Sequence, residues 1–170
     1  MRPTPADPAA WNAYLAEGNA TQARKRVAAD VLLRDPDGRV LLVKPTYKPG
    51  WDLPGGMSEA NEAPDDTARR EIKEELGLDL IRLRPLVIDW VPPHGPWDDQ
   101  IAFIFDGGTL THDQAASVRP HGDELSELRF ASPAQVADVL RGRLRRRFQA
   151  ARQAVAEGAP RYLRDGAPLG

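Results

Sequence analysis

The chain has 170 residues, 41% hydrophobic and 28% charged, with a net charge of −2, which is typical of one globular domain with a hydrophobic core. It contains no cysteine, which excludes disulfides and thiol catalysis. No apolar run has the length of a membrane helix, and the N-terminus lacks the apolar segment of a signal peptide, so we expect a cytoplasmic protein without membrane contacts.

The first part of the chain predicts a hairpin that follows an N-terminal extension. For residues 1–24, a short helix over residues 8–18 packed on the domain and a frayed extension both remain open, and we assign this segment no chemistry. Residues 26–34 and 39–44 are typical of strands. The DPDG sequence of residues 35–38 predicts the turn between them.

A stretch rich in proline and glycine leads from this hairpin towards the next element. Residues 45–56 (PTYKPGWDLPGG) form a tight approach, and the two final glycines let the backbone come close to a ligand. Lys44 and Lys48 could reach a phosphate, although lysines of such loops are more often solvated. We take Lys48 and Trp51 as candidates for substrate binding.

An acidic helix is predicted from Pro64 to Gly77. Proline suits a first helical turn, and glycine is common just after the last one. Ala68, Ile72 and Leu76 recur every four residues and form an apolar stripe that can pack on a sheet.

Three carboxylates crowd one face of this helix, because Glu71, Glu74 and Glu75 stand at positions i, i+3 and i+4. Like charges at i,i+4 destabilise an isolated helix by about 0.2–0.5 kcal/mol per pair, so a cation is expected beside them. Carboxylates without cysteine or a nearby histidine suit Mg2+ or Mn2+. An ordinary solvated helix, with Arg70 and Glu74 as an ion pair, is the alternative, and the full spacing of residues 56–78 disfavours it.

That spacing carries a resemblance. Residues 56–78 (GMSEANEAPDDTARREIKEELGL) resemble the Nudix box of the diphosphate hydrolases, G-x5-E-x7-R-E-U-x-E-E-x-G-U with U aliphatic, at every fixed position. The order strand, turn, strand, loop and box is also similar to the Nudix fold. The resemblance implies an α/β fold, an α/β/α sandwich with a mixed, curved sheet. It also implies Mg2+-dependent hydrolysis of a nucleoside diphosphate linked to another moiety.

The resemblance also implies roles for residues of the box. Arg70 would position the carboxylates through charge-assisted hydrogen bonds, and Glu62 would brace the loop or bind an outer metal. Two or three metal ions would lower the pKa of a bound water, and one carboxylate would accept its proton. The implied metal ligands are the carbonyl of Gly55 and the side chains of Glu71, Glu74 and Glu75.

Two further strands are predicted after the box. Residues 80–91 are typical of a long strand interrupted near Pro85, and residues 100–106 of a buried strand. The loop of residues 92–99 is expected at the mouth of the site. Its Trp97 could stack on a base, which is worth about 1–3 kcal/mol, or could simply cover the edge of the sheet.

Residues 107–125 show no clear periodicity and predict a mobile segment. A short strand over residues 127–130 and a helix over residues 133–140 follow. The resemblance implies that a carboxylate from the loop before this strand joins the metals or acts as the general base, and we favour Glu124. The competing residues are Asp123, Glu124 and Glu127.

The C-terminal part is basic, with eight arginines against three acidic residues in residues 134–170. An amphipathic helix is predicted over residues 142–157. A solvated basic face is favoured over nucleic-acid binding, because no aromatic residues interleave with the arginines. We divide the chain into an N-terminal extension, a domain over residues 25–158 and a C-terminal tail over residues 159–170.

The substrate is less constrained than the reaction. The expected partner is a small nucleoside diphosphate derivative. ADP-ribose or a nucleotide sugar is favoured, since ADP-ribose hydrolases of the family often carry a proline about fifteen residues after the box, as Pro93 does here. Nucleoside triphosphate sanitation comes next. A non-catalytic Nudix-like module, an RNA-cap hydrolase and a homodimer remain open, whereas the isomerase of this fold needs a cysteine that the chain lacks.

Overall fold

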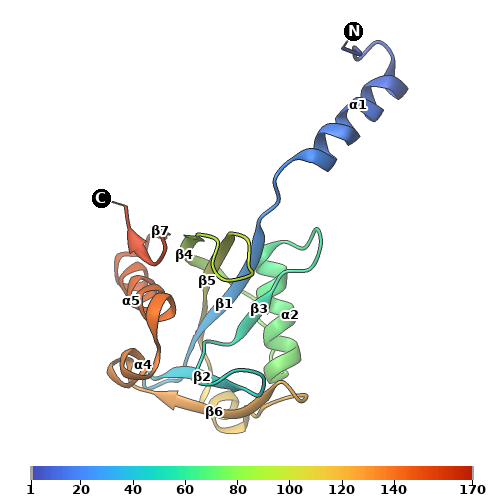
Figure 1. Cartoon of the computed structure of the whole chain (residues 1–170). Coiled ribbons are helices and arrows are strands. Elements are labelled where there is room, and N and C mark those ends of the chain that lie inside the picture. Colours follow the sequence, from blue (N-terminus) through green and yellow to red (C-terminus); the bar gives the residue numbers. More distant parts are fainter. Residues whose placement is uncertain (1, 170) are drawn as a thin grey trace.

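Strand β1 (Arg26–Arg34) is the axis of a mixed, eight-stranded sheet in the computed structural model, which describes residues 2–169 (Figure 1). Along its whole length β1 runs parallel to β5 (Gln100–Thr109). Two short partners share its other edge, β3 (Gly55–Met57) in its first half and β2 (Val40–Pro45) at its end. This arrangement brings the loop between β2 and β3 beside the middle of β1.

The other strands extend the sheet on both sides, in the order β6-β2-β1-β5-β4-β7-β8. The pairs β1–β5 and β4–β7 are parallel, and the other pairs are antiparallel. The mixed sheet predicted from the resemblance is therefore confirmed. The bounds of the outer strands are Arg84–Val91 for β4, Leu125–Ala131 for β6, Arg161–Arg164 for β7 and Ala167–Pro168 for β8.

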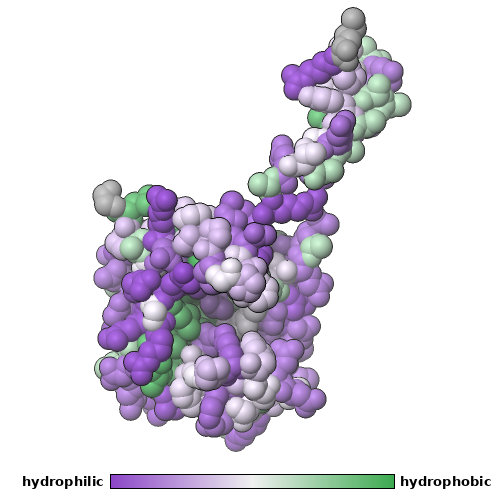
Figure 2. Space-filling view, viewed as in Figure 1, coloured by the Kyte–Doolittle hydropathy of each residue, from purple (hydrophilic) through white to green (hydrophobic). Residues whose placement is uncertain are grey.

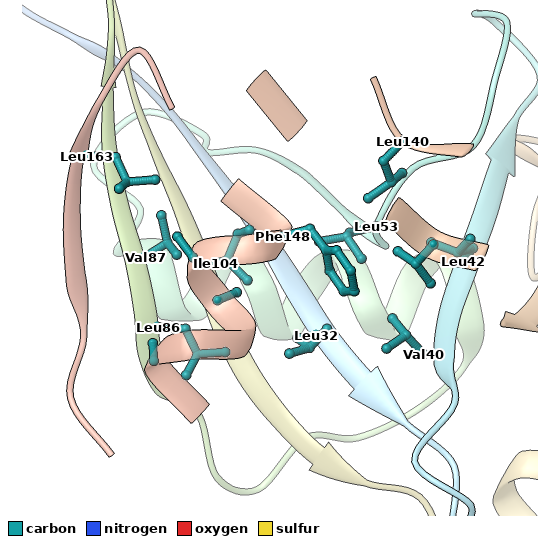
Figure 3. Packing of buried hydrophobic residues seen from close by; sticks show 14 of the residues in the cluster. Leu32, Val40, Leu42, Leu53, Leu86, Val87, Ile104, Leu140, Phe148 and Leu163 are labelled. Atoms are coloured by element: carbon teal, nitrogen blue, oxygen red, sulfur yellow. The ribbon is translucent and has the colours of Figure 1, made fainter. Parts of the chain in front are cut away.

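Helix α2 (Pro64–Leu76) covers one face of the sheet, and α4 (Pro133–Val139) and α5 (Gly142–Glu157) cover the other. The predicted stripe of α2 is buried against the side chains of β1 that point to its face. On the opposite face, Phe148 of α5 is fully buried, and Figure 3 shows it in the middle of a cluster with Leu32 and Leu53. The protein is thus an α/β/α sandwich, as expected.

The C-terminal residues differ from the tail that we expected. Strand β7 pairs with β4 and buries Leu163, and β8 folds back on β7. The two residues of the turn, Asp165 and Gly166, have positive φ angles of 55° and 76°. An Asp-Gly pair between two short runs is a known hairpin signal, because both central residues of that turn need positive φ.

Helix α1 (Pro8–Thr21) projects from the sheet instead of packing on it (Figures 1 and 2). It begins at a regular cap, in which the side chain of Asp7 accepts a hydrogen bond of 3.1 Å from the amide of Ala10. None of its residues is buried, and Leu15 is 47% exposed. Of the two expectations for residues 8–18, the helix is correct, but its packing on the domain is not.

Two other expectations need correction. Residues 107–125 continue β5 to Thr109 and then form helix α3 (His112–Ser117), which a Thr111–Gln114 capping box starts. The strand expected from residue 80 begins only at Arg84, and its pairing with β5 is irregular beyond Pro85. Among residues 2–169, no helix is both long enough and apolar enough to cross a membrane.

Candidate active site

Two glycines of β3 allow close contacts, Gly55 with the backbone of β1 and Gly56 with α2. Gly55 has a φ angle of 143°, and a Cβ added there would overlap the backbone of Ala29 and Asp30. A Cβ added at Gly56 would lie 2.5 Å from the carboxyl carbon of Glu71. The lack of a side chain at position 56 therefore lets the carboxylate of Glu71 lie against the strand.

Arg70 organises the carboxylates of α2. Its Nη1 donates to Glu71 at 2.9 Å and to Glu74 at 3.1 Å. Its Nε and Nη2 donate to the two oxygens of Glu62 at 2.8 and 3.0 Å, and Nη2 also donates to the carbonyl of Met57 at 3.0 Å. This geometry fits the positioning role expected of Arg70, because a guanidinium presents several donors in a rigid plane.

Glu62 holds the loop that precedes the helix. Besides Arg70, it accepts hydrogen bonds from the amide of Glu59 at 2.9 Å and from the hydroxyl of Thr67 at 2.7 Å. These bonds, with the bond from Arg70 as the largest cause, lower the pKa of Glu62 to about 2. Of the two roles considered for Glu62, the geometry favours bracing of the loop.

Glu75 is the most buried carboxylate of the helix, with 5% of the residue exposed. It accepts a hydrogen bond of 3.0 Å from the amide of Gly55. Burial is the largest cause that raises the pKa of Glu75, and together with the charges of Glu71, Asp30 and Glu124 it brings this pKa to about 8, against the lowering effect of the Gly55 bond. In these surroundings the charged form of a carboxyl group is unfavourable unless a cation lies beside it.

Glu124 lies near these groups, although it belongs to the segment before β6. Its charge contributes to the raised pKa of both Glu71 and Glu75. Glu127, by contrast, forms an ion pair of 2.5 Å with Lys44. Of the candidates in this segment, the structure thus brings Glu124 to the carboxylates and engages Glu127 elsewhere.

Lys48 and Trp51, the side chains predicted to bind substrate on the loop after β2, already contact other residues of the protein. Lys48 forms an ion pair with Asp52. Trp51 is half-buried, and the guanidinium carbon of Arg129 lies 4.4 Å from its ring centroid. Trp51 therefore packs against the hydrophobic core, and Arg129 lies over one face of its ring.

Trp97 remains accessible, with 54% of the residue exposed. The guanidinium carbon of Arg26 lies 4.4 Å from the centroid of its ring, so one face is occupied. Reciprocal backbone hydrogen bonds of 3.0 Å between His94 and Trp97 close the turn that presents it. The loop between β4 and β5 lies at the front of a face that is hollowed near its centre (Figures 1 and 2).

Two residues near the site were missed from the sequence. Asp30 lies on β1, where burial and the charge of Asp52 raise its pKa to about 7. The sequence could have indicated Asp30, because it is a lone carboxylate in an apolar strand. Tyr47 is 68% exposed on the loop after β2, and its pKa is raised by partial desolvation of its hydroxyl and by the charges of Asp52, Glu75 and Glu124. No periodicity distinguishes Tyr47 from an ordinary loop residue.

The carboxylate cluster fits a hard divalent cation. Its donors are all oxygens, which are the ligands that such cations prefer. Any side chain at position 56 would fill the space that holds Glu71. The buried Glu75 has no cationic partner among residues 2–169. Within the same range, no three acidic or histidine side chains are yet gathered closely enough to hold an ion. Glu71 and Glu74 turn instead towards Arg70, so we expect them to reorient when an ion binds.

Comparisons with known proteins show the family of the chain. A model of the NUDIX domain matches residues 24–153, so the chain belongs to the NUDIX family and is a Nudix hydrolase, an enzyme of the pyrophosphohydrolase class. A Bacillus subtilis (strain 168) protein named "Putative 8-oxo-dGTP diphosphatase" is 32% identical over 108 residues, which are 64% of this chain and 67% of that protein. An RNA pyrophosphohydrolase of Halorhodospira halophila is 40% identical over 48 residues, or 28% of this chain and 26% of that protein.

Solved structures show the same fold. The NUDIX domain of Shewanella oneidensis NrtR, complexed with ADP ribose, superposes with a TM-score of 0.67 at 18% identity and covers 85% of this chain and 98% of that one. The MutT protein of Methanosarcina mazei Go1 gives a TM-score of 0.63 at 24% identity, with 79% and 99% covered. Nudix hydrolases generally use divalent metal ions, in keeping with the carboxylate cluster.

Proposed function

We propose that this enzyme is a Mg2+-dependent pyrophosphohydrolase that cleaves the P–O–P bond of a nucleoside diphosphate linked to another moiety. The observation that carries the proposal is the convergence of carboxyl groups on Glu75, which is buried beside the amide of Gly55. A buried carboxylate close to other carboxylates is unfavourable as an anion without a cation, and Mg2+ prefers oxygen ligands.

The side chains of Glu71, Glu74 and Glu75, with the carbonyl of Gly55, would hold Mg2+, or Mn2+ in its place. When bound, such an ion neutralises diphosphate oxygens and lowers the pKa of a water molecule. In the metal-free protein Arg70 holds Glu71 and Glu74 beside the site through its bonds to both, and their carboxylates would turn from Arg70 towards the ion when it binds.

Glu124 is our candidate for the general base, because it is exposed, lies close enough to influence Glu71 and Glu75, and comes from a different element. A base of this kind takes the proton from the attacking water and contributes about 10²–10⁴-fold to the rate.

For the substrate we favour ADP-ribose or a nucleotide sugar. Pro93 stands fifteen residues after Leu78, and the loop that contains it presents the exposed ring of Trp97. Tyr47 offers a second exposed aromatic ring on the loop after β2, so the substrate could be held at two ends.

Nucleoside triphosphate sanitation is the second candidate, since the Bacillus subtilis relative is named for 8-oxo-dGTP. The partner is in either case a small nucleotide derivative. A non-catalytic module is disfavoured, because every carboxylate of the box is present.

A product analysis tests these alternatives. The protein would be incubated with ADP-ribose, a UDP-sugar, 8-oxo-dGTP and 5′-triphosphorylated RNA, each with Mg2+, with Mn2+ and with a chelator. We expect AMP and ribose 5-phosphate from ADP-ribose, only with metal. Pyrophosphate release from 8-oxo-dGTP at a higher kcat/KM would favour the second candidate, and the absence of turnover with every compound would contradict the proposal.

A further inference from the structure

A short strap, residues 121–124, joins the last turn of α2 to the loop after β2. Its flanking residues Val118 and Leu125 are buried in the same cluster as Leu76 of α2. Between them, the strap is exposed and contains Gly122 with a φ angle of 74°. An exposed strap with no apolar side chains of its own needs polar contacts to keep one position.

The first end of the strap is held by His121. Its amide donates to the carbonyl of Glu75 at 2.7 Å, and its Nδ1 lies 3.1 Å from the carbonyl of Glu74. Because a carbonyl only accepts, Nδ1 carries the proton in this contact. Both acceptors are carbonyls at the end of a helix, where no intrahelical donor remains for them.

The second end of the strap is held by Thr46. Its amide donates to the carbonyl of Glu124 at 2.8 Å. Its hydroxyl donates to the carbonyl of Asp123 at 3.1 Å and to that of Glu124 at 3.2 Å. Thr46 also lies directly before Tyr47, so one contact joins the strap to the loop that carries this exposed ring.

We propose that His121 and Thr46 are positioning residues, which clamp the strap at both ends and thereby hold Glu124 beside Glu71 and Glu75. The proposal rests on the proposed function, in which Glu124 is the general base. His121 binds the backbone of the residues that carry two of the carboxylates, so it fixes Glu124 relative to those carboxylates. The clamp replaces the mobile segment that the sequence led us to expect.

Replacing His121 by asparagine or by glutamine distinguishes a positioning role from a merely structural role. The amide nitrogen of asparagine takes the place of Nδ1, whereas that of glutamine takes the place of Nε2. We expect His121→Asn to retain kcat, and His121→Ala and His121→Gln to lower it about tenfold with KM changed less than twofold. A displacement of about 1 Å can cost about 100-fold, and the bonds of Thr46 would limit the loss.

A double variant tests whether His121 acts through Glu124. In the Glu124→Gln background, His121→Ala should lower kcat no further, since the group that it positions is already neutral. Thr46→Val should behave as His121→Ala does, whereas Thr46→Ser should retain kcat. The exposed histidine of α3 supplies the control, His112→Ala, which should leave kcat unchanged.

Hydrogen exchange of the metal-free protein provides a measurement that does not depend on turnover. The amide of Thr46, on the far side of the strap, should exchange at least tenfold faster in His121→Ala and at the wild-type rate in His121→Asn. Unchanged exchange at Thr46, or equal losses of kcat in the wild-type and Glu124→Gln backgrounds, would overturn the clamp. Faster exchange in a protein that hydrolyses no diphosphate would instead uphold the clamp and reject the proposed function.

Discussion

At the scale of single residues, the site depends on the absence of a side chain at position 56. The carboxylate of Glu71 occupies the space that a Cβ would fill, with its three carboxyl atoms at 2.5–2.7 Å from that point. Backbone strain plays no part, because Gly56 does not have a positive φ angle. The glycine is required for close approach alone.

Gly56→Ala should therefore displace Glu71 and weaken metal binding. We expect kcat/KM to fall at least about 100-fold, as for misplacement of a group by about 1 Å, with a far-UV circular dichroism spectrum like that of the wild type. Gly18→Ala, where no atom lies within 4 Å of an added Cβ, is the control. Full activity of Gly56→Ala at ordinary Mg2+ concentrations would show that Glu71 is not a ligand.

Glu75 predicts how stability depends on pH. Its pKa is about 8 in the folded protein against an ordinary value of 4.5, so between these values the folded protein holds a proton that the unfolded chain has lost. Unfolding releases that proton, and the free energy of unfolding of the metal-free protein should fall as pH rises from about 5 to about 8. Asp30, with a pKa of about 7, acts in the same direction.

Urea titrations at pH 5.5, 7 and 8.5 would measure this dependence. Glu75→Gln should make the free energy of unfolding depend less on pH. Saturating Mg2+ should raise the free energy of unfolding more at pH 8.5 than at pH 5.5, because metal and proton compete for the same oxygens. Equal stabilisation by Mg2+ at both pH values would argue against the carboxylate cluster as its site.

At the scale of elements, the arginines of α5 are partly explained by contacts within the protein. Arg147 donates at 2.6 Å to Asp89, which is fully buried and also accepts from the amide of Gly166 at 2.9 Å. Arg143 forms an ion pair with Asp165, and Arg146 donates to the carbonyl of the same residue at 2.8 Å. These bonds attach the C-terminal hairpin to the helix, which gives the basic run a structural purpose.

Removing Arg147 alone should lower the free energy of unfolding more than removing both Arg147 and Asp89. Arg147→Met leaves the carboxylate of Asp89 buried and unpaired, and we expect a loss of about 3–5 kcal/mol in the free energy of unfolding. The double variant with Asp89→Leu should recover part of this loss. Arg152→Ala, at an exposed position, should change stability by less than about 0.5 kcal/mol. Urea denaturation measures all three, and a loss below about 1 kcal/mol for Arg147→Met would contradict the account.

The sequence predicted best the elements that combine periodicity with a motif. The bounds of β1 and α5 agree with the predicted ranges, and the carboxylates of α2 share one face as their spacing requires. The hairpin after residue 160 was missed because Leu163 is its one buried apolar side chain among residues 161–169, although Asp165 and Gly166 carried the turn signal.

Contacts between distant segments could not be predicted in this way. The bonds from His121 to α2, like the electrostatic influence of Glu71 on Asp30, join segments that are far apart in the chain and leave no periodic trace in the sequence.

At the scale of the whole molecule, α1 stands apart from the sandwich. None of its residues is buried, and its aromatic side chains contact each other, with the rings of Trp11 and Tyr14 5.6 Å apart. Removing residues 2–22 should therefore leave the urea midpoint unchanged and the free energy of unfolding within about 0.5 kcal/mol of the intact chain. A marked loss of stability that depends on protein concentration would instead indicate that α1 packs on a second copy, as the homodimer left open by the sequence would require.

The central claim is that the carboxylates of α2 hold the metal for cleavage of a diphosphate bond. Its most direct test is the turnover of the best substrate by the wild type, Glu74→Gln and Glu75→Gln across a series of Mg2+ concentrations. Because glutamine keeps the size of the side chain and removes its charge, we predict a loss of at least about 100-fold in kcat for one or both variants, with the fold retained. Full Mg2+-dependent turnover in both variants would contradict the claim.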